Sequence, residues 1–144
     1  MKIPVNDFNW AGGERYMVSL RIVGSGFNFL TDAIIDTGSP WSIIMESDLK
    51  AKTRLPYSRL PKYKTVNLIT RIELLELSGE CKLIFRDTDN NAVQFSHKMY
   101  GGMFVDRNVQ LTQAFPSFIG KDFLDKNNLF IGKRDEKGRR YLEN

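Results

Sequence analysis

Short runs of alternating apolar and polar residues, separated by turn-forming residues, dominate this sequence. One such run spans 16–23 and another spans 27–35, with a Gly-Ser-Gly turn at 24–26 between them. A period of two places successive side chains on opposite faces of a strand. The pattern therefore predicts a β-hairpin whose second strand ends at Asp36.

Three further strand-like runs follow at 65–77, 80–86 and 92–100. The run 65–77 is long for one strand, so we expect a hairpin tip near 69–72 to divide it. A short amphipathic helix over 71–77 is the alternative. The intervening turn residues favour antiparallel pairing of these strands.

The C-terminal part of the chain predicts a short buried strand over 115–120 and a closing hairpin formed by 129–132 and 140–142. Two short helices are also expected, over 46–52 and over 121–127. The adjacent glycines Gly101 and Gly102 predict a loop between strands.

Composition limits the chain to one ordinary globular domain. It has 144 residues, of which 42% are hydrophobic and 26% charged, enough for one core but not for two lobes of similar size. We therefore treat 1–144 as a single domain with a core over about 16–132. The net charge of +4 is spread along the chain, so no nucleic-acid partner is expected. No apolar run reaches the length of a membrane span, and the simplest expectation is a soluble, cytoplasmic protein.

The cysteine and histidine content argues against metal chemistry. Cys81 and His97 are each the single residue of their type. An internal disulfide is impossible, and neither a metal site nor another cofactor is expected. We expect Cys81 to be a small core residue and His97 to lie on the surface of a strand.

The candidate chemistry is an acid at the end of a buried strand. Asp36 follows three apolar residues, and Thr37, Gly38 and Ser39 come directly after it. Gly38 allows the backbone to turn sharply and to approach other groups closely. No other acid of the chain, Asp87, Asp89, Asp106 and Asp122 included, repeats this setting.

Two segments in this order resemble the single-domain, retroviral-type (retropepsin-like) aspartic peptidases. The first is AIIDTGS at 33–39, which matches the catalytic pattern of apolar residues before Asp-Thr-Gly-Ser. The second is FIGKDFL at 118–124, which matches a pattern of two apolar residues, glycine and an acid that opens a short helix. The pair is far more specific than either segment alone.

The resemblance implies a mostly β, closed acid-protease barrel with one short C-terminal helix, active as a symmetric homodimer on peptide or protein substrates. Asp36 would be the catalytic carboxylate, and Thr37 would hydrogen-bond across the dimer axis. Gly38 would leave room for the substrate backbone, with Ser39 completing the loop. Gly120 would pack beside that loop as the supporting second motif.

The chain departs from this family at two places. Pro40 stands where some members carry an acid that pairs with the basic residue matching Lys121, so that ion pair cannot form. The family's glycine-rich flap matches by position only, at Ile69, Thr70 and Arg71, where no glycine occurs.

The predicted function is an aspartic endopeptidase that activates water between two Asp36 carboxylates, one from each subunit. Metal-free hydrolysis without a covalent nucleophile needs a general base and a general acid. Two adjacent carboxylates that share one proton provide both, and one chain offers one such motif. The alternative is a catalytically inactive dimeric module of the same fold that binds peptides or holds an assembly together.

Overall fold

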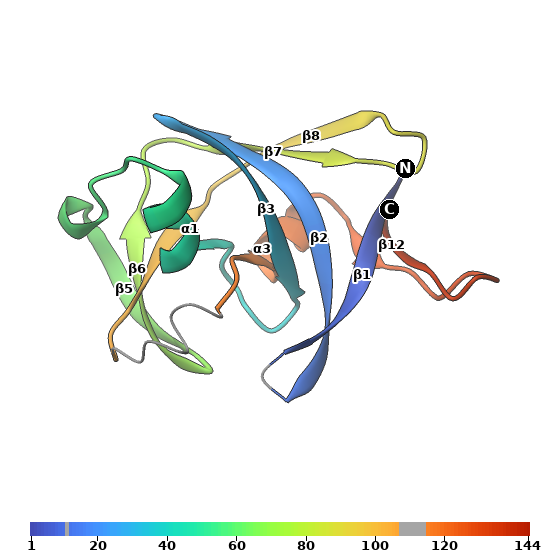
Figure 1. Cartoon of the computed structure of the whole chain (residues 1–144), viewed down its shortest axis with the longest axis horizontal. Helices are drawn as coiled ribbons and strands as arrows, with labels where there is room; N and C mark the ends of the chain where they lie inside the picture. Colours follow the sequence, from blue (N-terminus) through green and yellow to red (C-terminus); the bar gives the residue numbers. More distant parts are fainter. Residues whose placement is uncertain (11, 107–114) are drawn as a thin grey trace.

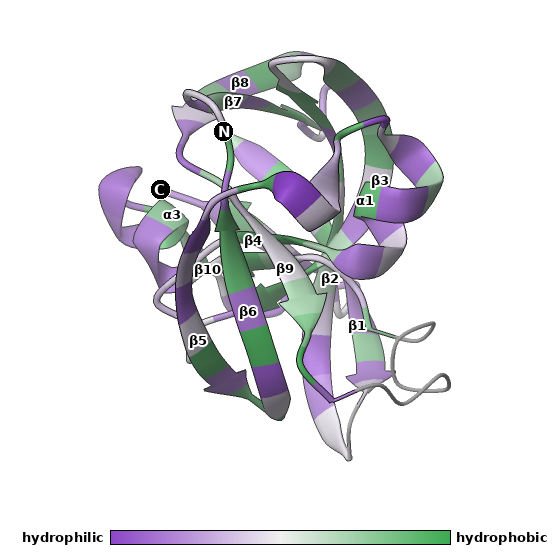
Figure 2. Cartoon of the chain, turned by 90° about the vertical axis from the view of Figure 1, so that its left-hand side faces the viewer, coloured by the Kyte–Doolittle hydropathy of each residue, from purple (hydrophilic) through white to green (hydrophobic). Residues whose placement is uncertain are grey.

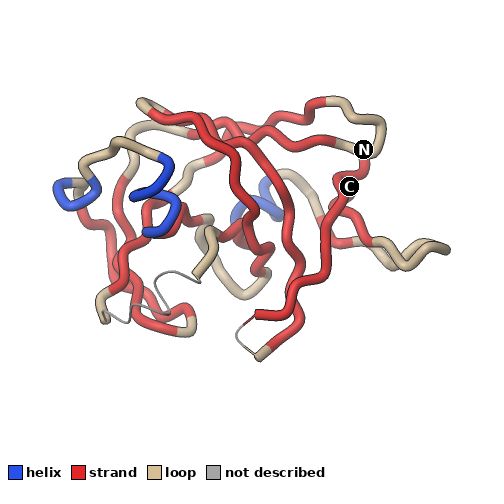
Figure 3. Tube along the Cα trace, viewed as in Figure 1, coloured by secondary structure: helices blue, strands red, loops and turns tan. Residues whose placement is uncertain are grey.

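The computed structural model describes residues 1–10, 12–106 and 115–144, and strands make up most of the chain (Figures 1 and 3). The described helical segments are α1 (Glu46–Lys52), α3 (Lys121–Lys126) and a 3₁₀ turn (Tyr57–Arg59). The described strands are β1 (Lys2–Trp10), β2 (Gly13–Gly24), β3 (Phe27–Asp36), β4 (Ile43–Met45), β5 (Lys62–Leu68), β6 (Thr70–Glu76), β7 (Cys81–Arg86), β8 (Ala92–His97), β9 (Tyr100–Phe104), β10 (Phe118–Gly120), β11 (Phe130–Ile131) and β12 (Arg140–Glu143).

The hairpin predicted to deliver Asp36 is confirmed. β2 pairs antiparallel with β3 from Tyr16↔Ile35 to Gly24↔Phe27. Burial alternates along the first part of β3 and becomes continuous over Ala33, Ile34 and Ile35. The reason is that the end of β3 lies between two hydrophobic clusters, with Ala33 and Ile35 in one and Ile34 in the other. An apolar run on both faces is what such a strand requires.

The described strands form one sheet that does not close. The order is β11-β12-β1-β2-β3-β10-β4-β9-β6-β5, and β7 and β8 branch from β2. The expected closed barrel is therefore wrong. The two end strands have features that discourage pairing with a further strand. β11 has only two residues, and β5 exposes Lys62 and Lys64.

The long apolar run near the middle of the chain forms a hairpin. β5 pairs antiparallel with β6 from Lys62↔Leu75 to Leu68↔Thr70, so the helical alternative is wrong. Hydrophobic and hydrophilic residues alternate along the first part of β6 in Figure 2, and the adjacent Leu74 and Leu75 are both buried.

Gly101 and Gly102 lie within β9 and not in a loop. A Cβ atom at Gly102 would lie 2.6 Å from Ile43 Cγ2 and 2.7 Å from Met45 Sδ. The predicted loop is wrong, because glycine here permits close packing between strands and does not form a turn.

The first and last strands were not anticipated as partners. β1 pairs with β12 from Lys2↔Glu143 to Val5↔Arg140, and both lie outside the expected core of 16–132. They join the same sheet and carry buried residues such as Ile3 and Leu142. Among the described residues, no helix has the length and apolar composition needed to cross a membrane.

Candidate active site

Asp36 is the last residue of β3, at the point where β10 joins that strand. The two strands pair in parallel, with Phe118 opposite Ile34 and Gly120 opposite Asp36. Segments more than eighty positions apart in the sequence therefore lie side by side. The two motifs singled out in the sequence form one structural unit.

The turn after β3 holds the Asp36 carboxylate from its own backbone. The Gly38 N–H donates to Asp36 Oδ1 at 2.9 Å, and the Ser39 N–H donates to the Asp36 carbonyl oxygen at 3.1 Å. Thr37 and Gly38 are exposed, whereas Ser39 is fully buried. The carboxylate is thus fixed on a tight turn whose outer face is open.

Gly120 supports this turn because it has no side chain. A Cβ atom there would lie 2.3 Å from the Trp41 carbonyl oxygen and 2.6 Å from that of Ser39. The next residue continues the contact, since the Lys121 N–H donates to the Ser39 carbonyl oxygen at 2.7 Å. The start of α3 is therefore hydrogen-bonded directly to the Asp36 turn.

Three polar residues that the sequence reading did not assign to the site lie behind the turn. The Ser42 hydroxyl donates to Asp122 Oδ1 at 2.8 Å and accepts from the Gly120 N–H at 2.9 Å. His97 Nε2 lies 2.8 Å from Asp122 Oδ2. His97 is only 5% exposed, so the expectation that it lies on the surface is wrong. Its pairing with an acid far along the chain leaves no local sequence signal.

Pro40 and Lys121 behave as the departure from the family pattern predicts. Pro40 is exposed. Lys121 lies 3.8 Å from Asp125 within α3, and both side chains are solvent-accessible. The basic residue of the second motif is thus paired inside its own helix.

The candidate flap residues lie at the tip of the β5–β6 hairpin. Ile69 occupies the turn with φ +70° and is 61% exposed, and Thr70 opens β6. Arg71 forms a two-contact ion pair with Asp106 at 2.9 and 3.2 Å. That pair raises the pKa of Arg71 and lowers the pKa of Asp106, mainly through the hydrogen bond. A hairpin therefore lies where the flap was expected, and its turn contains no glycine.

Three of the four acids considered as a second carboxylate have other partners. Asp87 accepts backbone hydrogen bonds from Asp89 and Asn91. Asp106 is held by Arg71, and Asp122 is held by Ser42 and His97. Within the described ranges, no three His, Cys, Asp or Glu side chains gather as a metal site would require.

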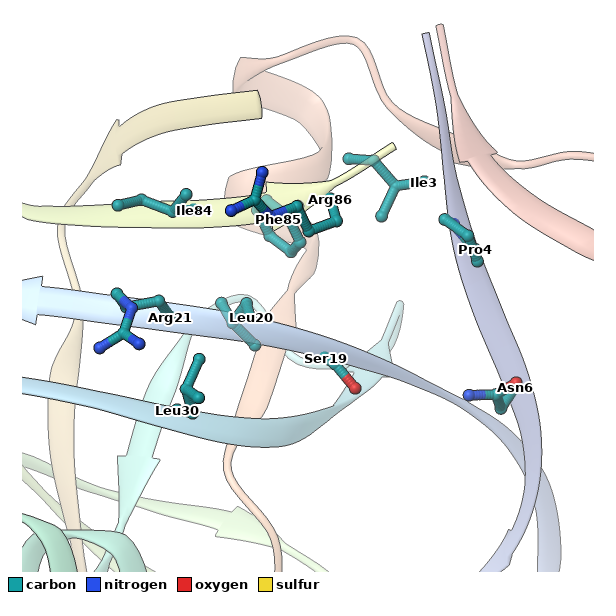
Figure 4. Close-up of a pocket in the computed structure, with 10 residues that line it drawn as sticks. All are labelled: Ile3, Pro4, Asn6, Ser19, Leu20, Arg21, Leu30, Ile84, Phe85 and Arg86. Carbon is teal, nitrogen blue, oxygen red and sulfur yellow. The ribbon is translucent and has the colours of Figure 1, made fainter. Parts of the chain in front are cut away.

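A separate cavity of about 460 Å³ lies where β2 leaves β1 and pairs with β7 (Figure 4). Its lining includes Ser19, Leu20, Arg21 and Arg86, and it holds neither a carboxylate nor any part of the Asp36 turn. It therefore offers no acid for hydrolysis of the kind predicted.

No family model and no curated protein sequence matches this chain. Among solved structures, it is similar to a retropepsin-like aspartic protease from Rickettsia conorii, with a TM-score of 0.55 and 13% identity over 99% of this chain and 88% of that one. It is also similar to the retroviral protease-like domain of Ddi1 from Leishmania major, with a TM-score of 0.44 and 15% identity over 89% and 94% of the two chains.

The Rickettsia likeness extends over nearly the whole of both chains and shows the fold. This chain has the mostly β, retropepsin-like aspartic protease fold. Its Asp-Thr-Gly turn lies at the end of β3, against Gly120 of β10.

Proposed function

We propose that this protein is an aspartic endopeptidase that acts as a homodimer, with one Asp36 from each subunit at a shared site. The observation that carries the proposal is the placement of the Asp36 turn against Gly120, in a chain with this fold. No cofactor is required, because two carboxylates can provide both the base and the acid.

The proposed reaction uses the two carboxylates as one unit. Held close together they share a single proton, the arrangement known from aspartic proteases, and the pair titrates jointly. The ionised carboxylate removes a proton from water while the water oxygen bonds to the peptide carbonyl carbon. The protonated carboxyl donates its proton to the carbonyl oxygen. Collapse of this intermediate breaks the C–N bond as a proton passes to the leaving amine.

The chain offers one Asp-Thr-Gly setting, so the second carboxylate is proposed to come from a second chain. Asp87, Asp106 and Asp122 each have partners of their own, so none is offered to Asp36. Thr37 and Gly38 are exposed beside the carboxylate, which suits contact with a second copy. The substrate would lie as an extended strand across the shared cleft.

Digestion of a mixed peptide library, from acidic to neutral pH, tests the proposal. The wild type is expected to cleave, and Asp36→Asn is expected to lose at least about 1,000-fold in rate, because removing one member of an acid–base unit disables the whole unit. Cleavage that persists in the variant contradicts the mechanism.

The second candidate is an inactive dimeric module of the same fold that binds peptides. It is favoured by Pro40, which has no N–H to offer a substrate backbone next to the Asp36 turn. This candidate predicts that neither protein cleaves the library and that Asp36→Asn leaves peptide binding unchanged. Fluorescence anisotropy with library peptides measures that binding.

A further inference from the structure

Ser42 is a fully buried residue whose polar groups are all engaged. Its N–H and its hydroxyl both donate to the Asp122 carboxylate, at 3.2 and 2.8 Å. Its hydroxyl oxygen accepts the Gly120 N–H at 2.9 Å, and its carbonyl oxygen accepts the Tyr100 N–H at 3.0 Å. Ser42 therefore ties the segment after the Asp36 turn to β9, β10 and α3.

Asp122 is held from the other side by His97, at the end of β8. His97 Nε2 lies 2.8 Å from Asp122 Oδ2, while Ser42 uses mainly Oδ1. The imidazole packs edge to face against Phe123, with ring centroids 5.3 Å apart. Nε2 faces a carboxylate oxygen, which only accepts, so the Nε2 N–H is the donor of this hydrogen bond, while Nδ1 is buried with no hydrogen-bond partner among the described residues. Both carboxylate oxygens of Asp122 are thus fixed.

This cluster differs from a nucleophilic triad. His97 contacts Asp122 and not Ser42, and Ser42 has no exposed surface. A serine nucleophile needs a base next to its hydroxyl and access to substrate. Ser42 has neither, so the cluster serves to hold structure in place.

The cluster is connected to the Asp36 backbone through Ser42 and Gly120. Asp122 holds Ser42, Ser42 holds the Gly120 N–H, and Gly120 lies opposite Asp36 in the β3–β10 pairing. We propose that Asp122, supported by His97, is a positioning residue that sets the orientation of the Asp36 turn through Ser42. This proposal rests on the proposed peptidase function.

Loss of the Asp122 carboxylate would leave a buried N–H and a buried hydroxyl of Ser42, and the His97 N–H, without acceptors. Unsatisfied buried groups rearrange to find partners, and Ser42 directly follows the turn at 37–41, so a shift of Ser42 would carry that turn with it. Displacement of a catalytic group by about 1 Å is enough to cost about 100-fold in rate. The expected defect is therefore in kcat, with substrate binding largely kept.

The test compares three substitutions at two positions of α3 in the intact protein, with the best peptide found in the library as substrate. Asp122→Ala should lower kcat by about 10- to 100-fold with KM changed by less than about threefold. Asp122→Asn keeps an amide oxygen that accepts from the Ser42 hydroxyl, and its amide N–H can donate to His97 Nε2 once the imidazole proton moves to Nδ1, so this variant should restore kcat to within about fivefold of the wild type. Asp125→Ala, on the exposed side of α3, should match the wild type.

Amide hydrogen exchange of the same proteins separates this proposal from the proposed function. Asp122→Ala should accelerate exchange at Ser39, Ser42 and Gly120, and Asp125→Ala should not. If the wild type cleaves nothing but this exchange pattern appears, the positioning role stands and the peptidase proposal fails. If Asp122→Ala keeps the wild-type kcat, or exchange at these amides is unchanged, the positioning role is overturned.

Discussion

Gly120 is the residue at which the Asp36 turn leaves no room for a side chain. The prediction is that Gly120→Ala lowers the free energy of unfolding by about 2–3 kcal/mol, because the new methyl group meets two backbone carbonyl oxygens that cannot move away separately. Urea unfolding followed by circular dichroism measures the change. Gly26→Ala is the control, with open space around the position and a cost of about 1 kcal/mol from its positive φ. Equal losses in the two variants would contradict the packing argument.

Cys81 gives a second prediction at this scale. The thiol is buried, and desolvation raises its pKa from 9.0 to about 11. The folded state holds the thiol proton more tightly than the unfolded chain does. The contribution of Cys81 to the free energy of unfolding is therefore fully present below pH 9 and is lost as the pH rises towards 11.

At pH 8 the folded protein should therefore react with iodoacetamide at least about 100-fold more slowly than the urea-unfolded protein, since the thiolate is the reactive form. Mass spectrometry of the alkylated chain measures both rates. Comparable rates would show that Cys81 is accessible in the folded state.

At the scale of elements, the β5–β6 hairpin is the candidate flap. Ile69 is a β-branched residue in the left-handed region of backbone conformation, and its side chain is 61% exposed. That side chain therefore contributes little to the stability of the monomer. We predict that Ile69→Asn, which tolerates that backbone conformation better, leaves stability unchanged or higher and lowers kcat/KM by about tenfold through lost apolar contact with substrate.

Steady-state kinetics and thermal unfolding measure the two effects of Ile69→Asn. Leu30→Asn is the matched control, since Leu30 is equally exposed at 61% but lies in β3, outside the hairpin. An equal loss of kcat/KM in both variants would show that the β5–β6 hairpin has no specific role in substrate binding.

At the scale of the whole molecule, the dimer proposal predicts that peptidase activity falls when inactive subunits exchange into the dimers. When wild type is mixed with an equal amount of Asp36→Asn, random pairing leaves about one quarter of the dimers with two intact carboxylates. Activity at constant total protein should fall to about that fraction, whereas independent chains would keep half. Mixing with Asp125→Ala, which alters only an exposed ion pair, should cause no loss.

Local patterns in the sequence determined much of this fold and the position of the candidate acid. Alternation predicted the β2–β3 hairpin, and the apolar residues before Asp36 marked the end of a buried strand. These features were predictable because strand periodicity depends on neighbouring residues. The place of Gly120 beside the Asp36 turn was implied only by the family resemblance, and a Cβ atom at Gly120 would lie 2.3 Å from the Trp41 carbonyl oxygen.

Only the tertiary structure decided which distant residues share an environment. It paired Gly120 with Asp36, placed Gly102 inside a tightly packed strand and buried His97 against Asp122. It also left the sheet open, with a two-residue strand at one end and a strand that exposes Lys62 and Lys64 at the other. Such outcomes depend on packing between segments far apart in the chain. A single sequence gives the identity of each residue but does not show which distant residues will be in contact.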